Sequence, residues 1–180
     1  VKQNAAFALV SLAEEAPNRV LDEYNELIQH LEKPLTSDSE RTTENAALIL
    51  ARVAVEAPLR ILDEYDDLIQ HLDKLLTSEN DQAKQKAALG LVSLAAEATS
   101  RVLNEYNELI QHLDKPLTSD SDRTMGSATL ALRRLAEGAP TRILDQYDEL
   151  IQHLDKPLTS DFELANRNAA FALGYLAREA

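Results

Sequence analysis

Apolar side chains recur in this chain at the three- and four-residue spacing of an α-helix. Val20, Tyr24, Leu27 and Leu31 form one such stripe, and the positions between them are mostly acids and amides. Apolar residues at this spacing share one face of a helix, and the polar residues take the other. The pattern predicts a first helix over about residues 19–33, with an acidic side facing the solvent.

A second apolar stripe follows on the same spacing. Ala46, Leu50 and Val53 mark the buried side of a helix expected over about residues 38–57. Leu48 lies nearly opposite that side, and its position is also apolar elsewhere in the chain, at Phe7, Leu89, Leu130 and Phe171. A helix that is apolar over so wide an arc is normally enclosed by neighbours. We therefore predict an inner helix, and an apolar stripe open to a ligand is the alternative.

Prolines mark the expected end of the first helix, and serines mark the expected start of the second. Pro34, Pro116 and Pro157 are expected to end the first helix, because proline disfavours helical geometry in the residue before it, whereas Leu75 stands at that place once. A serine that precedes an acid by three residues then predicts a capping box at the start of the second helix, at Ser37, Ser78, Ser119 and Ser160.

The pentapeptide Leu-Ile-Gln-His-Leu ends at Leu31, Leu72, Leu113 and Leu154, so the whole pattern repeats every 41 residues. A helical pattern with a period of about 40 to 47 residues is typical of stacked helix pairs. We predict an all-α superhelix of about nine helices in two-helix repeats, forming a single array over residues 1–180. Its parts are a half repeat and four full repeats, over residues 1–16, 17–57, 58–98, 99–139 and 140–180.

Both ends of the chain look like internal helices. Residues 1–16 and 162–180 carry the apolar Phe7, Leu9 and Phe171 where a terminal repeat of a solenoid usually has a polar cap. We expect either a segment of a longer array or self-association through the uncapped ends.

The second helices resemble HEAT-type repeats along the whole chain. The resemblance is carried by Asn45-Ala46-Ala47-Leu48 and Asn168-Ala169-Ala170-Phe171, each leading to a Leu-Ala or Val-Ala pair. It implies a HEAT-like solenoid, and such repeats serve mostly as protein-binding scaffolds and occasionally as enzymes. HEAT repeats often carry an arginine before the alanine pair, where this chain has Lys2, Thr43, Lys84, Met125 and Asn166, so the usual Asp–Arg ladder is not expected.

Charge and composition exclude several classes of partner. The formal charge is −13 and the pI is about 4.7, whereas nucleic-acid binding depends on Lys and Arg that neutralise phosphates. No apolar run approaches the ~20 residues of a membrane span. The chain has no cysteine, and therefore neither disulfides nor thiolate metal sites. We expect a cytoplasmic protein without nucleic-acid or membrane partners.

The four histidines, His30, His71, His112 and His153, suggest a metal site at first sight. Equivalent side chains of stacked helices lie ~8–10 Å apart, whereas zinc ligands converge to ~2.1 Å from one ion. Each histidine follows an acid by four residues, which favours the charged imidazole. We interpret them as structural, with a pH-responsive surface as the alternative, and expect no metal and no cofactor.

Catalytic signatures are also missing from the sequence. It contains no cysteine nucleophile and no glycine-rich phosphate loop. We therefore predict a protein that is not an enzyme. Bilin lyases of the phycobilisome type share the Ala-Ala pattern, so a HEAT-like lyase or accessory protein remains an alternative. A self-assembling structural subunit is another.

Positions that vary between repeats on the second helix indicate where a partner binds. In a solenoid the inner helices line the concave face. The predicted strip consists of Arg41, Asn45, Arg52, Lys86, Ser93, Arg123, Arg134, Asn168 and Tyr175. The outer segments from Arg19 to Lys33 and their equivalents carry 16 acids and 8 bases, whereas this strip is rich in arginine. We expect a protein or peptide segment with acidic residues to lie in this groove.

Overall fold

The computed structural model describes residues 11–12, 15–23, 26, 32–35 and 39–179. Throughout these residues the regular secondary structure is helical, and no strand occurs among them. Most of the expected half repeat lies outside the described residues, as does the middle of the first predicted outer helix. Of that outer helix, α2 (Pro17–Glu23) and α4 (Glu32–Leu35) are described. No helix in this described part has the length and apolarity that a bilayer crossing requires.

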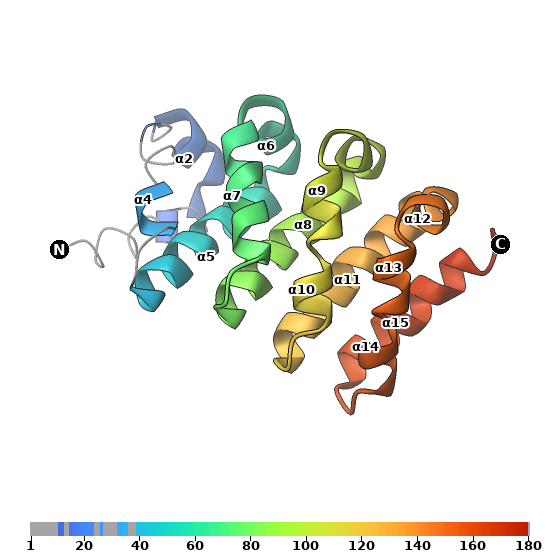
Figure 1. Cartoon of the computed structure of the whole chain (residues 1–180). Helices are drawn as coiled ribbons and strands as arrows, with labels where there is room; N and C mark the ends of the chain where they lie inside the picture. Colours follow the sequence, from blue (N-terminus) through green and yellow to red (C-terminus); the bar gives the residue numbers. More distant parts are fainter. Residues whose placement is uncertain (1–10, 13–14, 24–25, 27–31, 36–38, 180) are drawn as a thin grey trace.

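Within residues 39–179, four helices form the inner layer and pack side by side along the molecule (Figure 1). They are α5 (Glu40–Glu56), the first part of α8 (Asp81–Glu105), α11 (Asp122–Gly138) and α15 (Glu163–Leu176). Helix α8 bends at Ala98, whose φ of −146° and ψ of 51° are not helical. The bend directs the end of α8 into the outer layer.

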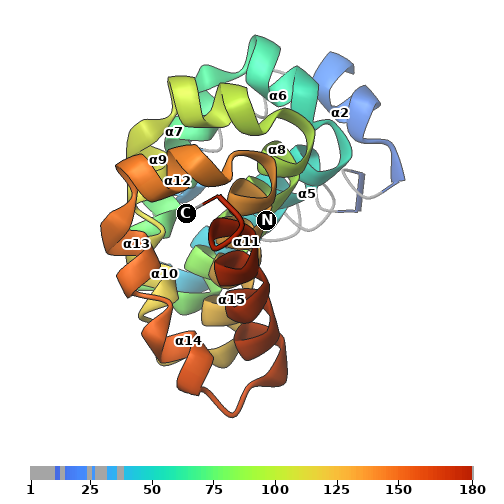
Figure 2. The ribbon, with the colours of Figure 1, turned by 90° about the vertical axis from the view of Figure 1, so that its right-hand side faces the viewer.

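The outer layer consists of short helices that lie to one side of the inner helices, as the view along the stack shows (Figure 2). In the second repeat they are α6 (Pro58–Glu64) and α7 (Asp66–Leu76). The third and fourth repeats continue with α9 (Asn107–Gln111), α10 (Asp114–Leu117), α12 (Pro140–Gln146), α13 (Asp148–Gln152) and α14 (Asp155–Thr159).

The expected continuous outer helix is therefore divided, and the first break is at a tyrosine. Tyr65, Tyr106 and Tyr147 leave helical geometry, with φ between −127° and −136° and ψ between 39° and 56°. Each hydroxyl reaches the preceding repeat: Tyr65 donates to the carbonyl of Leu21 at 3.2 Å, Tyr106 to Asp66 at 2.6 Å and Tyr147 to Asn107 at 2.7 Å. The break places these rings between repeats.

The prolines do not end the outer helix, contrary to the expectation. Pro116 and Pro157 lie inside α10 and α14, and the helix is interrupted a few residues before each of them. Proline has no N–H to donate to the carbonyl four residues earlier, and its ring clashes with that carbonyl. Where Leu75 stands instead, α7 runs from Asp66 to Leu76 without interruption.

The serines of the predicted capping boxes lie two residues before the helix caps. Asn80 and Ser121 are the N-cap residues of α8 and α11, and their side chains accept from the backbone N–H of Ala83 and Thr124. Each predicted serine instead accepts a hydrogen bond from the backbone N–H of the N-cap residue two positions later. The pairs are Ser78 with Asn80, Ser119 with Ser121 and Ser160 with Phe162, at 3.0 to 3.1 Å. They shape the turn before the helix. Ser37 is outside the described residues.

Alanines allow the inner helices to approach one another closely. Ala47, Ala88 and Ala136 are 0% exposed, and large side chains of the outer layer such as Leu62 and Ile110 cover the inner helices from one side. Small residues at a helix contact shorten the distance between helix axes. Leu48, Leu89 and Leu130 are half-buried, whereas Phe171 in the last repeat is 48% exposed.

Candidate protein-binding surface

All nine predicted binding residues lie on the inner helices. Arg41 and Arg123 are exposed, and Asn168 is 1% exposed. The remaining six are half-buried: Asn45, Arg52, Lys86, Ser93, Arg134 and Tyr175. Eight of these side chains therefore reach the solvent to some degree, and Asn168 does not; the binding role of the strip remains a prediction.

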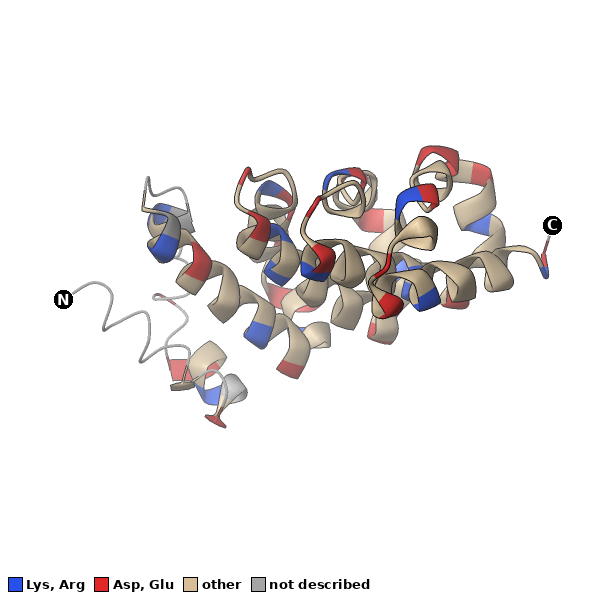
Figure 3. Cartoon of the chain, turned by 90° about the horizontal axis from the view of Figure 1, so that it is seen from below, with Lys and Arg blue, Asp and Glu red and all other residues tan. Residues whose placement is uncertain are grey.

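The basic residues of the two layers have different partners. On the outer side, Arg60 pairs with Asp22 at 2.8 Å and Lys156 with Asp120 at 2.7 Å. On the inner helices, by contrast, several bases form no ion pair with a described residue: Arg41, Lys86, Arg123 and Arg133. Long stretches of the inner helices are uncharged, whereas acids and bases occur together on the outer segments (Figure 3). No described acid therefore neutralises these inner cations.

Arginines at the start of the second, third and fourth outer segments bond to the preceding repeat. Arg101 donates from Nη2 to the carbonyl of Leu62 at 2.5 Å, and Arg142 donates in the same way to Leu103 at 2.6 Å. Arg101 also pairs with Asp63, and Arg142 bonds the side chain of Asn104. This ladder differs from the Asp–Arg ladder usual in HEAT repeats. Its signal in the sequence was the constant arginine at position 19 and its equivalents.

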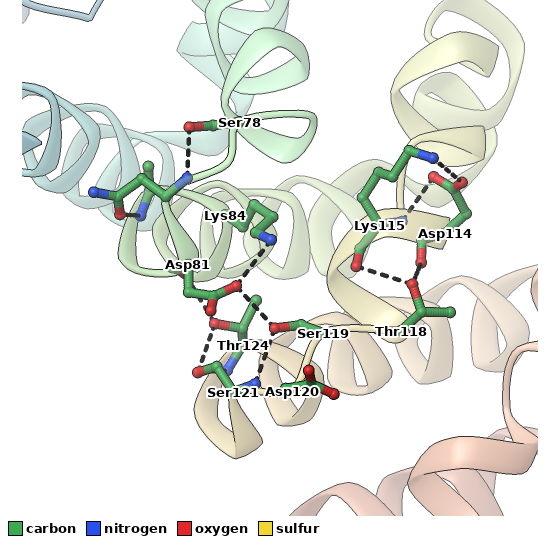
Figure 4. A network of polar contacts seen from close by, with 12 residues as sticks. Ser78, Asp81, Lys84, Asp114, Lys115, Thr118, Ser119, Asp120, Ser121 and Thr124 are labelled. Carbon is green, nitrogen blue, oxygen red and sulfur yellow. Dashed lines mark hydrogen bonds and ion pairs between the residues drawn. The ribbon is translucent and has the colours of Figure 1, made fainter. Parts of the chain in front are cut away.

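A polar network fixes the turn between α10 and α11 against the start of α8 (Figure 4). Asp81 pairs with Lys84 at 2.8 Å and accepts from the hydroxyl of Ser119 at 2.8 Å, while its carbonyl accepts from Thr124 Oγ1 at 2.9 Å. The hydrogen bond from Lys84 lowers the pKa of the Asp81 carboxyl, partial burial opposes this effect, and Ser119 adds to it. The network holds the inner helices in register.

One carboxylate joins the inner surfaces of α11 and α15. Glu137 accepts from Arg134 Nη1 at 2.9 Å and from the hydroxyl of Tyr175 at 3.1 Å. The guanidinium of Arg178 lies 5.8 Å from the centre of the Tyr175 ring. Two predicted binding residues, Arg134 and Tyr175, are thus brought together by an acid that the sequence did not single out.

A second group beside it is built around Arg133. Its guanidinium lies 4.6 Å from the centre of the Phe171 ring, and its Nη1 donates to Asn168 Oδ1 at 3.2 Å. Sequence reasoning missed Arg133. The available signal was its column, in which Ala51, Val92 and Gly174 stand at the equivalent places and only this repeat carries a charge.

The described histidines form no metal centre. His112 Nδ1 lies 2.6 Å from an oxygen of Asp73 in the preceding repeat, rather than beside Glu108 as helical spacing had led us to expect. His71 is 8% exposed and His153 is half-buried. Among the residues that the structure places, no three His, Cys, Asp or Glu side chains are close enough to hold an ion.

Grooves between outer segments are acidic. One groove of about 630 Å³ lies between the second and third repeats and is lined by Asp66, Asp73, Glu105 and Glu108. Another of about 520 Å³ lies between the third and fourth repeats and is lined by Asp114, Asp145, Asp148 and Glu149. The outer face therefore repels anions, whereas the inner helices offer cations to them.

No protein-family model and no curated protein matches this chain. Among solved structures, it is similar to an engineered protein (27% identity, TM-score 0.81, covering 99% of this chain and 75% of the other). It is also similar to a computationally designed armadillo repeat protein for modular peptide recognition (20% identity, TM-score 0.81, covering 96% of this chain and 74% of the other). A third similar structure is the karyopherin Kap121p bound to the extreme C-terminus of a protein phosphatase (20% identity, TM-score 0.79, covering 97% of this chain and 17% of the other).

The chain has the helical-repeat solenoid fold that HEAT and armadillo repeats share. This confirms the predicted fold class and the HEAT-type resemblance. The two repeat types are nearly equivalent at this level of similarity. The likeness to the designed armadillo protein and the karyopherin, at 20% identity, concerns the fold alone.

Proposed function

We propose that the chain is a non-catalytic scaffold that binds a protein or peptide segment in a groove lined by the second helix of each repeat. The observation that carries the proposal is the set of inner bases without ion pairs to described residues, above all Arg41, Lys86 and Arg123. The whole chain has 31 acids and 18 bases, so internal carboxylates are abundant and yet do not neutralise these cations. A bound segment with acidic residues would complement them.

The similar structures support this class of function. One is named for modular peptide recognition, and the karyopherin holds the C-terminal end of another protein. Both are binding proteins with the same stacked-helix architecture, which agrees with a scaffold rather than an enzyme. A cytoplasmic location remains a prediction from the sequence.

The test begins with a peptide-display selection against the chain, followed by affinity measurements on the selected peptides. Reversing two inner charges with Arg41→Glu and Arg123→Glu should weaken binding at least about tenfold, because close charge pairs across an interface contribute ~1.5–7 kcal/mol. The matched control reverses two outer charges, Lys74→Glu and Lys115→Glu, and should leave the affinity within about twofold. Equal affinities of the inner-face variant and the unchanged chain would refute the proposal.

A second candidate function, self-assembly, rests on the outward face of α15. Ala47 and Ala88 are 0% exposed in α5 and α8, which the next inner helix covers. The equivalent Ala170 of α15 is exposed, and a Cβ added at Gly174 would meet nothing within 4 Å. This face thus repeats an interface that the chain already uses between its own helices. We propose a second copy of the chain as its occupant.

Light scattering over a range of concentrations tests this second proposal. The unchanged chain should show a mass that rises with concentration, and Ala170→Glu should keep it monomeric, because a charge would be buried in the contact. Ala96→Glu is the matched control, since Ala96 is exposed on α8 and Glu137 occupies the equivalent place on α11. A strict monomer at high concentration would exclude the second copy as occupant.

A further inference from the structure

The cation of Arg133 has no carboxylate partner among the described residues. Its Nη1 donates to the amide oxygen of Asn168 at 3.2 Å, and its planar group stacks near Phe171, 4.6 Å from the ring centre. Both partners orient the guanidinium without neutralising its charge. A cation fixed in one orientation loses little further freedom when it binds an anion.

Nearby hydrogen-bond donors also lack acceptors within the described residues. They are Arg133 Nε, Arg134 Nε and Asn168 Nδ2, and the Asn168 side chain is 1% exposed. An enclosed donor without an acceptor costs about 1–3 kcal/mol. These enclosed nitrogens cannot themselves touch a ligand at the surface, but they show that the group around Arg133 is short of acceptors. A carboxylate carries acceptor sites on both oxygens and carries no donor when ionised.

The local charge is positive in an otherwise acidic chain. Glu137 is held by Arg134 and Tyr175, Arg178 lies near the Tyr175 ring, and Arg133 has no acid partner among the described residues. The remaining positive charge lies on an inner surface of a chain whose formal charge is −13. The Arg134 side chain is 40% exposed and that of Arg133 is half-buried, so both remain accessible at the surface.

An apolar side chain adjoins this cation. Phe171 is 48% exposed, and the residues at its position in the other described repeats are leucines that are half-buried. A ring that supports a guanidinium on one side strengthens its orientation by a cation–π contact. Since Ala51, Val92 and Gly174 replace Arg133 in the other repeats, this arrangement occurs once in the described part of the chain.

We infer that Arg133, with Arg134 beside it and Asn168 and Phe171 positioning it, forms a subsite for the carboxylate of an Asp or Glu side chain. This inference rests on the proposed function, since the acid belongs to a segment bound along the inner helices. In the described part of the chain the subsite occurs once, between α11 and α15, so it would fix the register of the bound segment.

Two capped eight-residue peptides of alternating alanine and glutamate, or alanine and glutamine, are the probes. They are titrated into chain labelled with ¹⁵N-arginine at neutral pH and low salt. The glutamate peptide should shift the Nε–H signals of Arg133 and Arg134 saturably, and the glutamine peptide should bind about tenfold more weakly or worse, because its amide cannot form an ion pair with the guanidinium.

Variants locate the effect. Arg133→Gln should reduce the affinity for the glutamate peptide about tenfold, which corresponds to ~1.4 kcal/mol. Phe171→Leu, the residue found at this position in the other described repeats, should weaken binding less. Arg167→Gln removes an exposed arginine from α15, the helix that carries Phe171, and should have little effect. If Arg133→Gln unfolds the chain, Arg133→Lys keeps the charge and should still weaken binding, because lysine lacks the planar group.

Equal binding of the two peptides, or unchanged affinity in Arg133→Gln, would overturn the subsite. If selected peptides still bind and still respond to reversal of Arg41 and Arg123, the scaffold function stands without this subsite. If no selected peptide responds to that reversal, both proposals fail together.

Discussion

Arg142 donates from Nη2 to the carbonyl oxygen of Leu103 at 2.6 Å, across the boundary between two repeats. The carbonyl belongs to the end of α8, and the arginine lies in the first turns of α12. Arg101 makes the equivalent bond one repeat earlier, to Leu62. In the outer layer, a charged side chain thus donates a hydrogen bond to a backbone carbonyl of the preceding repeat.

Removing this contact should weaken the stack. Arg142→Met keeps the aliphatic stem and should lower the free energy of unfolding by about 1–3 kcal/mol, because it removes a hydrogen bond from a charged donor. Urea denaturation followed by circular dichroism measures the change. Arg167→Met is the control, because Arg167 is an exposed arginine of α15. Equal losses in the two variants would show that the bond to Leu103 does not stabilise the stack.

Alkaline pH should destabilise the chain through its tyrosines. Burial raises the pKa of Tyr65, Tyr106 and Tyr147, and the carboxylate of Asp66 adds to the effect at Tyr106. The folded state therefore holds the phenol proton more tightly than the unfolded state, in which tyrosine titrates near pH ~10. This contribution to stability is complete below that pH and is lost as pH rises toward the folded-state pKa.

Urea midpoints between pH 8 and pH 11 test the tyrosine prediction. The double variant Tyr106→Phe and Tyr147→Phe should be less stable at pH 8, because two hydrogen bonds are lost. It should also lose less stability between these pH values than the unchanged chain. An identical pH dependence of the two proteins would contradict the explanation.

Acid should act through Asp81. The hydrogen bond from Lys84 lowers its pKa below that of the unfolded chain, so its contribution is present above pH ~3.9 and is lost as pH falls through the folded-state pKa. Asp81→Asn should therefore destabilise at pH 7 by less than about 1 kcal/mol, since the pair is partly solvated. The difference should vanish near pH 2, and Asp161→Asn, at an exposed position, should show no such pattern. A difference that persists at pH 2 would assign the effect to shape rather than charge.

Gly138 is predicted to be intolerant of a side chain. An added Cβ would lie 2.8 Å from the Cβ of Thr99, so Gly138→Ala should cost about 1–3 kcal/mol of stability. Gly174→Ala, with nothing within 4 Å, should instead gain about 0.5–1 kcal/mol because alanine favours helix.

A compensating variant sharpens the glycine test. One repeat earlier, the positions of Thr99 and Gly138 are occupied by Pro58 and Glu97. A proline at the first position is therefore compatible with a side chain at the second. Thr99→Pro should therefore reduce the cost of Gly138→Ala. Thermal unfolding of the four proteins in this double-mutant cycle gives the coupling. Additive effects would show that Thr99 is not the source of the clash.

The layers could be predicted from the sequence because apolar spacing directly reports which helix faces are buried. The break at Tyr65 could not, since the helical stripe continues through it. At this break the hydroxyl of Tyr65 contacts Leu21 of another repeat, and spacing within one repeat does not report such a contact. Likewise, the spacing of Ser78 and Asp81 fits a capping box, but Asn80 lies where the helix begins.

The candidate site was only partly predictable. Comparison of repeats found positions such as Arg123 and Arg134, which are accessible on the inner helices. It did not distinguish Asn168, which varies in its column but is 1% exposed beside Arg133. Burial depends on the side chain of the facing helix, and a column within one chain does not contain that information.

The side-chain bonds that join repeats connect residues 35 to 44 apart, for example Arg133 with Asn168 and Tyr65 with Leu21. Each repeat is therefore stabilised by contacts with the adjacent repeats alone, and the stability of any one interface depends on the two repeats that form it. A mechanical load along the stack would then open it at its weakest junction, while the units on either side keep their shape.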